Sequence, residues 1–422
     1  MKKPPGGGSE MLCESYNARF REGIYMQLAG ISLAIPSILI VTTSLIFAWI
    51  ISTRSTFYRK LIDDEVTKNR FHSIDGLRGY LAMSVALSHL VVNHQFYTTG
   101  KWQGTPSSLA TFFGSGGVAF FFMITAFLFW NRISFGNAAF DAVKFLQSRV
   151  HRLVPMYLVA SILVILTALL LTHLQLNVSP LDLAKQIASW ILFTAPGDPD
   201  INGFNGTSII NGVFWTLVYE WKFYLLLPLL AALINTRARN LIMPAACACI
   251  YLFAYPPVEW LFVSGAIASV AIRNKLIKSI VSRWWFAIIA TGIIAATIRL
   301  IPQPYSLAGA TMLFLPFLSI ASGNTIFGLL TLRPARLLGA ISYSFYLMHS
   351  WVLYILYRVA AHFADVSALS EIEYWAIGLL VFLASIALSS FTFRFVEAPF
   401  MRTANKIALK SERDHALTGA GR

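Results

Sequence analysis

The sequence predicts an all-α integral membrane protein, and three observations lead to that fold class. Hydrophobic residues make up 57% of the 422 positions and charged residues only 12%, against about 25% in an ordinary soluble domain. Several apolar runs approach the roughly 20 residues that an α-helix needs to cross a bilayer. Lys and Arg gather in alternate connections between these runs, as the positive-inside rule predicts for a multi-pass protein.

Eleven apolar runs are candidate transmembrane helices. Their ranges are 24–51, 77–95, 109–130, 153–172, 213–234, 240–255, 257–272, 284–300, 305–330, 337–357 and 373–393. The runs 240–255 and 257–272 are short, and only Pro256 separates them. We therefore expect a core of ten helices and one extra N-terminal transmembrane helix.

The first run is expected to be a retained anchor rather than a cleaved signal peptide. It is over twenty residues long, follows a polar N-terminus and ends in IFAWIISTRS, without a small-residue cleavage pattern. We predict a disordered N-terminus over residues 1–23, an anchor over 24–52, a transmembrane domain over 71–402 and a basic tail over 403–422.

The basic residues predict the orientation of the chain. If the connection 52–76 is cytoplasmic, alternation places 24 of the 33 Lys and Arg residues on the cytoplasmic side, together with the C-terminus. The net charge of +14 then reflects membrane topology, and we expect no nucleic-acid partner. Cys13, Cys247 and Cys249 are too sparse for a disulfide framework or a zinc site, so no metal is expected.

Arg78 and His89 belong to FHSIDGLRGYLAMSVALSHL, residues 71–90. Their separation on an α-helix is about 1100° of rotation, roughly 20° beyond three turns, with about 16 Å of rise. Both side chains should share one face, Arg78 at the cytoplasmic surface and His89 near the bilayer midplane. This arrangement suits a ligand with an anionic end and a reactive end. Arg78 could instead only anchor the helix, and His89 could bond a neighbouring helix, but ionisable groups at depth usually line a site.

Arg149 and Arg152, in FLQSRVHRLVPMY, lie three residues apart and share a helix face. Paired guanidinium groups can hold phosphates in a bidentate manner. The positive-inside rule alone would also place arginines just before a span, so the pair by itself leaves both interpretations open.

Glu220 and Lys222 lie inside the run 213–234. They are two residues apart, so they point to nearly opposite sides of a helix and each needs another partner. Tyr224 shares the face of Glu220, and Lys222 could extend to the interface or pair with a different span. For Glu220 a structural salt bridge between helices and a role in substrate binding are equally compatible with the pattern.

Two further segments carry polar residues near or within spans. ISYSFYLMHSW places His349 midway along the run 337–357, with Tyr343 and Tyr346 nearby. FRFVEAPFMR places Glu397 at the end of the last run, where we expect a salt bridge to Arg394 or Arg402. The largest external connection, 173–212, is rich in Pro, Gly, Asn and Asp and is expected to be a structured loop. It could be a lid or an acceptor-binding element, or equally an inert connector.

Six segments share motifs, in order, with one known group. Residues 71–89 carry Asp75, Gly76, Leu77, Arg78, Gly79 and His89 in the pattern F-R-x-L-D-G-L-R-G followed by a histidine eleven residues after the last arginine. The segments GGVAFFFMITAFL, RVHRLVPMY, WTLVYEWKFYLLLPLL, SYSFYLMH and FRFVEAPF follow. Together they resemble the membrane-bound acyltransferase family 3 over residues 71 to about 402.

The resemblance implies a ten-helix domain that transfers an acyl group, usually acetyl from cytoplasmic acetyl-CoA, to a hydroxyl of a carbohydrate or glycolipid. Such enzymes modify O-antigen or exopolysaccharide in the bacterial inner membrane. The resemblance implies that His89 is the general base and that Arg78, Arg149 and Arg152 bind the coenzyme A phosphates. Substrate-binding or structural roles are implied at Asp75, Glu220, Tyr224, His349 and Glu397.

The sequence also departs from the family pattern. Trp221 and Lys222 stand where the family usually has Glu and Gln, Ala119 and Ala126 replace a polar residue and a glycine, and no soluble SGNH-type C-terminal domain is expected. The changes at 221 and 222 put the acceptor pocket in question more than the chemistry. A transporter with a His, Glu and Lys relay, or a non-catalytic glycan-binding member of the family, would be the alternatives.

Overall fold

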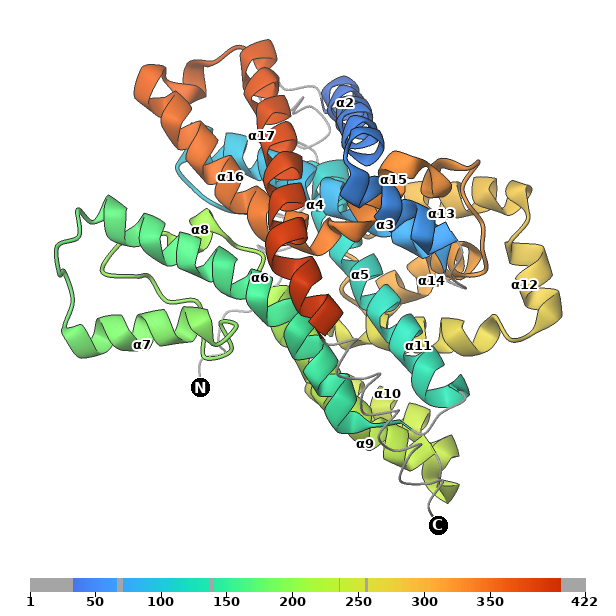
Figure 1. Cartoon of the computed structure of the whole chain (residues 1–422). Coiled ribbons are helices and arrows are strands. Elements are labelled where there is room, and N and C mark those ends of the chain that lie inside the picture. The colour runs from blue at the N-terminus through green and yellow to red at the C-terminus, as the bar shows by residue number, and fades with distance from the viewer. Residues whose placement is uncertain (1–32, 67–70, 137–139, 235, 255–256, 404–422) are drawn as a thin grey trace, which may run out of the picture.

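The computed structural model of the chain is an assembly of helices (Figure 1). It describes residues 33–66, 71–136, 140–234, 236–254 and 257–403. The predicted disordered N-terminus, 1–23, lies outside these residues, as does the predicted basic tail, 403–422, apart from its first residue. The described residues contain no β-strand and only one isolated bridge, between Ile201 and Phe204. The predicted all-α class is confirmed for this part of the chain.

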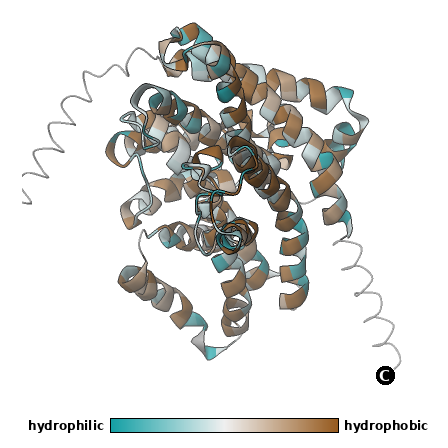
Figure 2. Cartoon of the chain, turned by 90° about the vertical axis from the view of Figure 1, so that its left-hand side faces the viewer, coloured by the Kyte–Doolittle hydropathy of each residue, from teal (hydrophilic) through white to brown (hydrophobic). Residues whose placement is uncertain are grey.

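Sixteen α-helices are described, and hydrophobic residues predominate along them (Figure 2). Their bounds are α2 Ala34–Arg54, α3 Thr56–Val66, α4 His72–Thr99, α5 Ser108–Phe135, α6 Ala142–Leu171, α7 Pro180–Ile191, α8 Thr207–Ile210, α9 Trp215–Ile234, α10 Ile242–Phe253, α11 Glu259–Ala271, α12 Lys275–Val281, α13 Trp284–Leu300, α14 Leu307–Ala321, α15 Arg333–Ala340, α16 Ser342–Phe363 and α17 Glu371–Thr392. Short 3-10 helices lie at Arg237–Leu241 (η1), Leu329–Thr331 (η2) and Val366–Ala368 (η3), and a π-helical turn, η4, spans Phe393–Glu397.

Each of the eleven predicted runs contains one of these helices, but the helices differ in length. Within the described residues five of them, α2, α5, α6, α9 and α17, are long and apolar enough to cross a membrane. The bent pair of α11 and α12 would make a sixth if it is one broken span, with 111° between its halves. The helices α4 and α16 are 28 and 22 residues long and carry four of the polar candidate residues, Asp75, Arg78, His89 and His349. The run 305–330 becomes helix only to Ala321, because Gly323 and Gly328 adopt positive φ in the turns that follow.

Helix α4 lies between the two main hydrophobic clusters of the molecule. Ile74, Leu77 and Leu81 belong to the cluster formed with α5, α6, α9 and α14, whereas Met83 and Leu87 belong to the one formed with α2, α16 and α17. Most of the length of α4 is therefore buried. Its polar residues are held inside the protein rather than against lipid.

Two close backbone approaches fix the start of α4. A Cβ atom added at Gly339 of α15 would lie 1.8 Å from the backbone oxygen of Asp75, and one added at Gly76 would lie 1.8 Å from that of Leu330. Only glycine leaves room for this contact. The glycines therefore hold the turn that carries Asp75 and Arg78 against α15 and η2.

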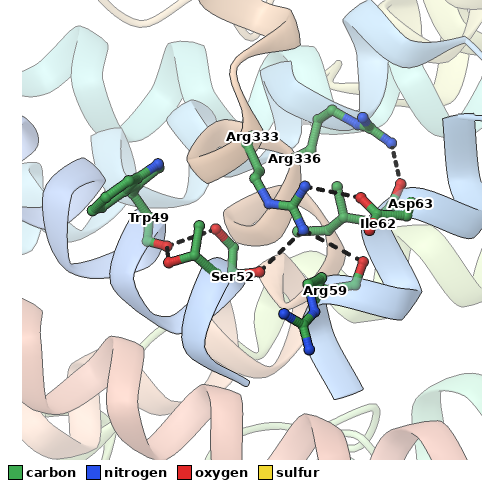
Figure 3. Close-up of polar contacts among 8 residues, drawn as sticks. Trp49, Ser52, Arg59, Ile62, Asp63, Arg333 and Arg336 are labelled. Carbon is green, nitrogen blue, oxygen red and sulfur yellow. Dashed lines mark hydrogen bonds and ion pairs between the residues drawn. The ribbon is translucent and has the colours of Figure 1, made fainter. Parts of the chain in front are cut away.

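The N-terminal helices α2 and α3 are bound to α15 by two arginines (Figure 3). Arg333 donates to the carboxylate of Asp63 at 2.8 Å and to the carbonyl oxygen of Ser52 at 3.2 Å, and Arg336 donates to the carbonyl of Ile62 at 2.7 Å. Small residues of α2, among them Ser44 and Ala48, are fully buried, which is typical of closely packed membrane helices. The extra N-terminal helix is thus packed against the rest of the protein.

The connection 173–212 is ordered, and it contains a helix that the sequence did not predict. Helix α7 begins with a proline after the Ser179 N-cap, whose hydroxyl accepts from the backbone N–H of Asp182. The buried Asn202 ties the rest of the loop to α6, because its amide nitrogen donates to the hydroxyl of Thr172 at 2.8 Å and to the carbonyl of Gln175 at 2.7 Å. The loop therefore has a defined shape over the bundle.

Candidate active site

Five of the predicted polar residues, from three sequence segments, line one cavity. Arg78 comes from α4, Arg149 and Arg152 from α6, and Glu220 and Tyr224 from α9. The cavity holds about 870 Å³, counted with its open mouth. Residues more than 140 positions apart in the sequence are thus brought to one site by the packing of α4, α6 and α9.

The cavity has an excess of positive charge. Three guanidinium groups and one carboxylate line it. Tyr224 donates a hydrogen bond to Glu220, and the Arg149 guanidinium lies 4.9 Å from the ring centroid of Phe129 and 5.9 Å from that of Tyr224. The Nε of Arg149 is buried and has no hydrogen-bond partner. This donor is available to an anionic ligand.

Glu397 lies beside this cavity, and its partner differs from the one predicted. It is fully buried and forms an ion pair with Arg152 of α6, while Ser344 donates to its other oxygen at 2.8 Å. Arg394 and Arg402, the predicted partners, instead lie over the ring of Phe57 at 5.4 and 5.5 Å. The prediction was wrong because the π-helical turn η4 directs Glu397 inward, away from the arginines nearest in sequence.

His89 and His349 form a pair on the far side of the cavity wall. The Nδ1 of His89 lies 3.0 Å from the Nε2 of His349, and the two rings are stacked with centroids 5.1 Å apart. Neither ring lines the cavity of the arginines. Tyr346 lies between the cavity and the histidine pair. It lines the cavity, where its hydroxyl is 3.0 Å from that of Thr216, and its ring centroid is 6.1 Å from that of His349.

The hydrogen bonds of the pair determine which nitrogen carries each proton. The Nδ1 of His349 lies 3.1 Å from the carbonyl oxygen of Phe345, which can only accept. With both imidazoles neutral, His349 must protonate Nδ1 and accept at Nε2, so His89 must donate from Nδ1. The Nε2 of His89 is then left with a free lone pair. Ser350 adds a hydroxyl 3.2 Å from the Nδ1 of His89.

The remaining candidate residues have clear positions. Asp75 lies in the first turn of α4, where its backbone oxygen faces Gly339. Lys222 points away from Glu220, as predicted from their spacing, and its Nζ lies 4.7 Å from the ring centroid of Tyr219. Ser344 and Ser350 were not singled out from the sequence, although each directly neighbours a tyrosine or histidine that was. The described residues contain no cluster of His, Cys, Asp and Glu that could hold a metal ion.

Comparisons with known proteins agree with the motifs. Residues 71–394 match the family model described as an acyltransferase domain, acyltransferase 3. BcsY of Komagataeibacter xylinus, a proposed membrane-bound transacylase, is 26% identical over 309 residues, which cover 68% of this chain and 74% of BcsY. Nodulation protein 10 of Rhizobium leguminosarum bv. viciae is 24% identical over 338 residues, covering 71% of this chain and 85% of that protein. No solved structure matches.

The family match extends over most of the chain and includes every candidate residue except Glu397. It favours a membrane-bound acyltransferase over the transporter that the sequence left as an alternative. The chain belongs to the acyltransferase 3 family of membrane-bound acyltransferases.

Proposed function

We propose that this acyltransferase takes an acyl group, acetyl in the simplest case, from acyl-CoA bound at the arginine cavity. It passes the group to a hydroxyl of a carbohydrate or lipid-linked glycan. The observation that carries this proposal is the convergence of Arg78, Arg149 and Arg152 on one cavity, with the histidine pair just beyond its wall.

The charge and shape of the cavity fit an anionic donor such as coenzyme A. Guanidinium groups bind phosphate oxygens through paired charge-assisted hydrogen bonds. The ion pair with Glu397 orients Arg152, and the bond from Tyr224 fixes Glu220 beside Arg149. We assign Asp75, Glu220, Tyr224 and Glu397 to holding the arginines in position. The phosphates then lie at the mouth, and the thioester extends inward toward Tyr346.

His89 is the proposed general base. Its Nε2 takes the proton from the acceptor hydroxyl as the oxygen attacks the thioester carbonyl carbon. The new C–O ester bond forms and the C–S bond breaks. The leaving coenzyme A thiolate takes the proton back from Nε2 of His89, which regenerates the base. His349 acts as a positioning residue, because its Nε2 accepts the hydrogen bond from the Nδ1–H of His89 and so leaves the Nε2 of His89 as the base. Movement of the Tyr346 side chain would open the path between the cavity and this base.

The proposal also includes the arrangement in the membrane. The eleven helices that correspond to the predicted runs, the α2 anchor among them, are assigned as spans, and residues 71–402 as the catalytic domain. The basic connections and the C-terminus lie in the cytoplasm, where acyl-CoA is available. Both named relatives come from bacteria, which supports a place in a bacterial cytoplasmic membrane.

The test is transfer of label by the purified enzyme. We expect radiolabelled acetyl-CoA to give labelled product with a glycan acceptor, and His89→Ala to lower kcat by about 10²–10⁴-fold, the range for a general base. Lys185→Ala, at an exposed ion pair of the outer loop, is the control and should match the wild type. If the wild type neither transfers nor hydrolyses the acetyl group, or His89→Ala retains full activity, the proposal fails.

A further inference from the structure

Two more cavities lie on the other side of α9, away from the arginines. One, of about 630 Å³, lies beneath the outer loop, and the other, of about 820 Å³, lies between α9, α10 and α11. Tyr219 and Lys222 line both of them. The two cavities therefore adjoin each other at one turn of α9, and neither is used by the proposed donor site.

The cavity beneath the outer loop combines aromatic and polar side chains. Trp190, Trp215 and Tyr219 line it together with Asp198 and Asn211. The loop fixes Trp190 by a 2.8 Å hydrogen bond from its indole nitrogen to the carbonyl of Pro199. A sugar ring presents C–H groups on its face and hydroxyls at its edge. Aromatic surfaces with a few convergent polar groups suit such a ligand.

This cavity also adjoins the helix that carries His349. The side-chain amide of the buried Asn211 donates to the carbonyl of Leu347 of α16 at 2.8 Å. Asn211 thus connects the wall of the cavity to α16, which carries His349 of the histidine pair. A ligand bound beneath the loop would lie next to α16, the helix that carries the proposed positioning residue His349.

The second cavity is almost entirely apolar. Its lining includes Trp130, Phe223, Leu226 and Ile250. Leu226 is 46% exposed, so this cavity opens on the outer surface of α9, which faces lipid if α9 spans the membrane. A hydrocarbon chain could enter it from the bilayer without crossing polar groups.

Two charged residues stand at the polar end of the apolar cavity. Lys222 forms no ion pair with any residue that the structure describes, and its Nζ lies over the ring of Tyr219. Glu259, at the start of α11, has a buried Oε2 atom without a hydrogen-bond partner. The cation suits a phosphate, and the free carboxylate oxygen can accept from a sugar hydroxyl. Lys222 is also one of the residues that depart from the family pattern.

We infer that these adjoining cavities bind the acceptor, and that it is a lipid-linked glycan. The sugar lies beneath the outer loop against Trp215, the phosphate at Lys222 and the hydrocarbon chain along α9 past Leu226. The order of the cavities, polar and aromatic, then cationic, then apolar, matches the order of groups in such a lipid. This inference rests on the proposed function, since it names the substrate class of the same reaction.

The experiment measures binding of a defined probe to the full-length enzyme without any acyl donor. The probe is a synthetic polyprenyl diphosphate carrying a disaccharide, titrated into protein in detergent while the thermal unfolding midpoint is followed. We expect saturable stabilisation, an apparent Kd at least tenfold weaker in Lys222→Met, and loss of binding in Leu226→Trp, which fills the apolar cavity. Leu229→Trp is the matched control, because Leu229 is 57% exposed on the same helix and does not line that cavity.

Three comparison ligands test whether the site requires the sugar, the lipid chain and the diphosphate together. The same polyprenyl diphosphate without sugar, the free disaccharide and phosphatidylethanolamine should each bind at least tenfold more weakly than the probe. Trp215→Ala should remove the difference between the probe and the sugar-free lipid. If any of these three ligands binds as tightly as the probe, or if Leu226→Trp binds the probe as tightly as the wild type, the inference is overturned. The binding assay contains no acyl-CoA, so its result is independent of the transfer assay described above. Binding of the probe by an enzyme that transfers no acetyl group would overturn only the proposed function. Acetyl transfer by an enzyme that does not bind the probe at this site would overturn only the inference.

Discussion

The histidine pair shows how the hydrogen bonds of one side chain fix the tautomer of another. His349 is almost fully buried, and its Nδ1 is committed to the carbonyl of Phe345. Its other nitrogen can therefore only accept from His89. A positioning residue of this kind sets which nitrogen of the base is free, without itself touching the substrate.

Replacing His349 should separate positioning from structure. We expect His349→Phe to lower kcat by about 10²-fold, at the low end of the range for general-base catalysis, because His89 loses its acceptor. The KM for acyl-CoA should stay the same, since the arginines are unaffected. His349→Gln, which keeps an acceptor oxygen, should recover most of the activity. Steady-state kinetics of both variants check this, and equal losses in the two would indicate a packing role instead.

The arginines of the cavity should respond differently to mutation. Arg149 has a buried donor without a partner, so Arg149→Ala should act on ligand binding. The loss of one charged hydrogen bond is worth about 1.5–3 kcal/mol, which is a rise in KM for acyl-CoA of about 10–100-fold. Thermal stability should change little. A large fall in stability with unchanged KM would contradict a donor-binding role.

Arg152 should instead affect stability, because it neutralises the fully buried Glu397. Removing one partner of a buried ion pair costs about 3–5 kcal/mol. We expect Arg152→Ala to lower the thermal unfolding midpoint in detergent and to reduce the yield of folded protein. Adding Glu397→Gln should restore part of the midpoint, since no unpaired charge is then left buried. No recovery in the double variant would show that the ion pair is not the cause.

Among the elements, the contact between α4 and α15 is the most tightly constrained. Gly339 has no space for a side chain because the backbone oxygen of Asp75 occupies it. We expect Gly339→Ala to force α4 and α15 apart, at a cost of about 1–3 kcal/mol for overpacking, and to displace Arg78. Gly292→Ala is the control, because nothing lies within 4 Å of the added Cβ in α13, and a helix gains stability from this change. Thermal unfolding of both variants, with KM for acyl-CoA, measures the difference.

The elements also show the limits of hydrophobic pattern. All eleven apolar runs contain helix, but their pattern could not show where a helix stops inside a run, as α14 does at Ala321. Helices α3 and α7 escaped prediction because neither is an apolar run. Each is short, and α7 lies in a connection where Pro, Gly, Asn and Asp predominate.

Across the whole molecule, the sequence motifs singled out the candidate residues, but not their partners. Helical spacing correctly placed Arg149 and Arg152 together and Lys222 opposite Glu220, because these relations lie within one helix. The ion pair of Arg152 with Glu397 joins positions 245 apart, and the bond of His89 with His349 joins positions 260 apart. Such contacts depend on how α4, α6, α16 and α17 pack, which no local pattern encodes.

The distribution of Lys and Arg residues along the chain predicts its orientation in the membrane. The basic segment around α12 is assigned to the cytoplasm and α7 to the outside, and the two helices lie at opposite sides of the molecule (Figure 1). In cells, a membrane-impermeant maleimide should label Lys185→Cys of α7 directly. It should label Lys278→Cys of α12 only after permeabilisation, in a background where Cys13, Cys247 and Cys249 are replaced by serine. Lys185 is an exposed residue and each substitution removes a single surface charge, so neither should disturb folding.

The reverse labelling pattern would show that the topology is the opposite of the one predicted. It would also place the mouth of the arginine cavity away from the cytoplasmic acyl-CoA pool, so the same result would count against the donor assignment.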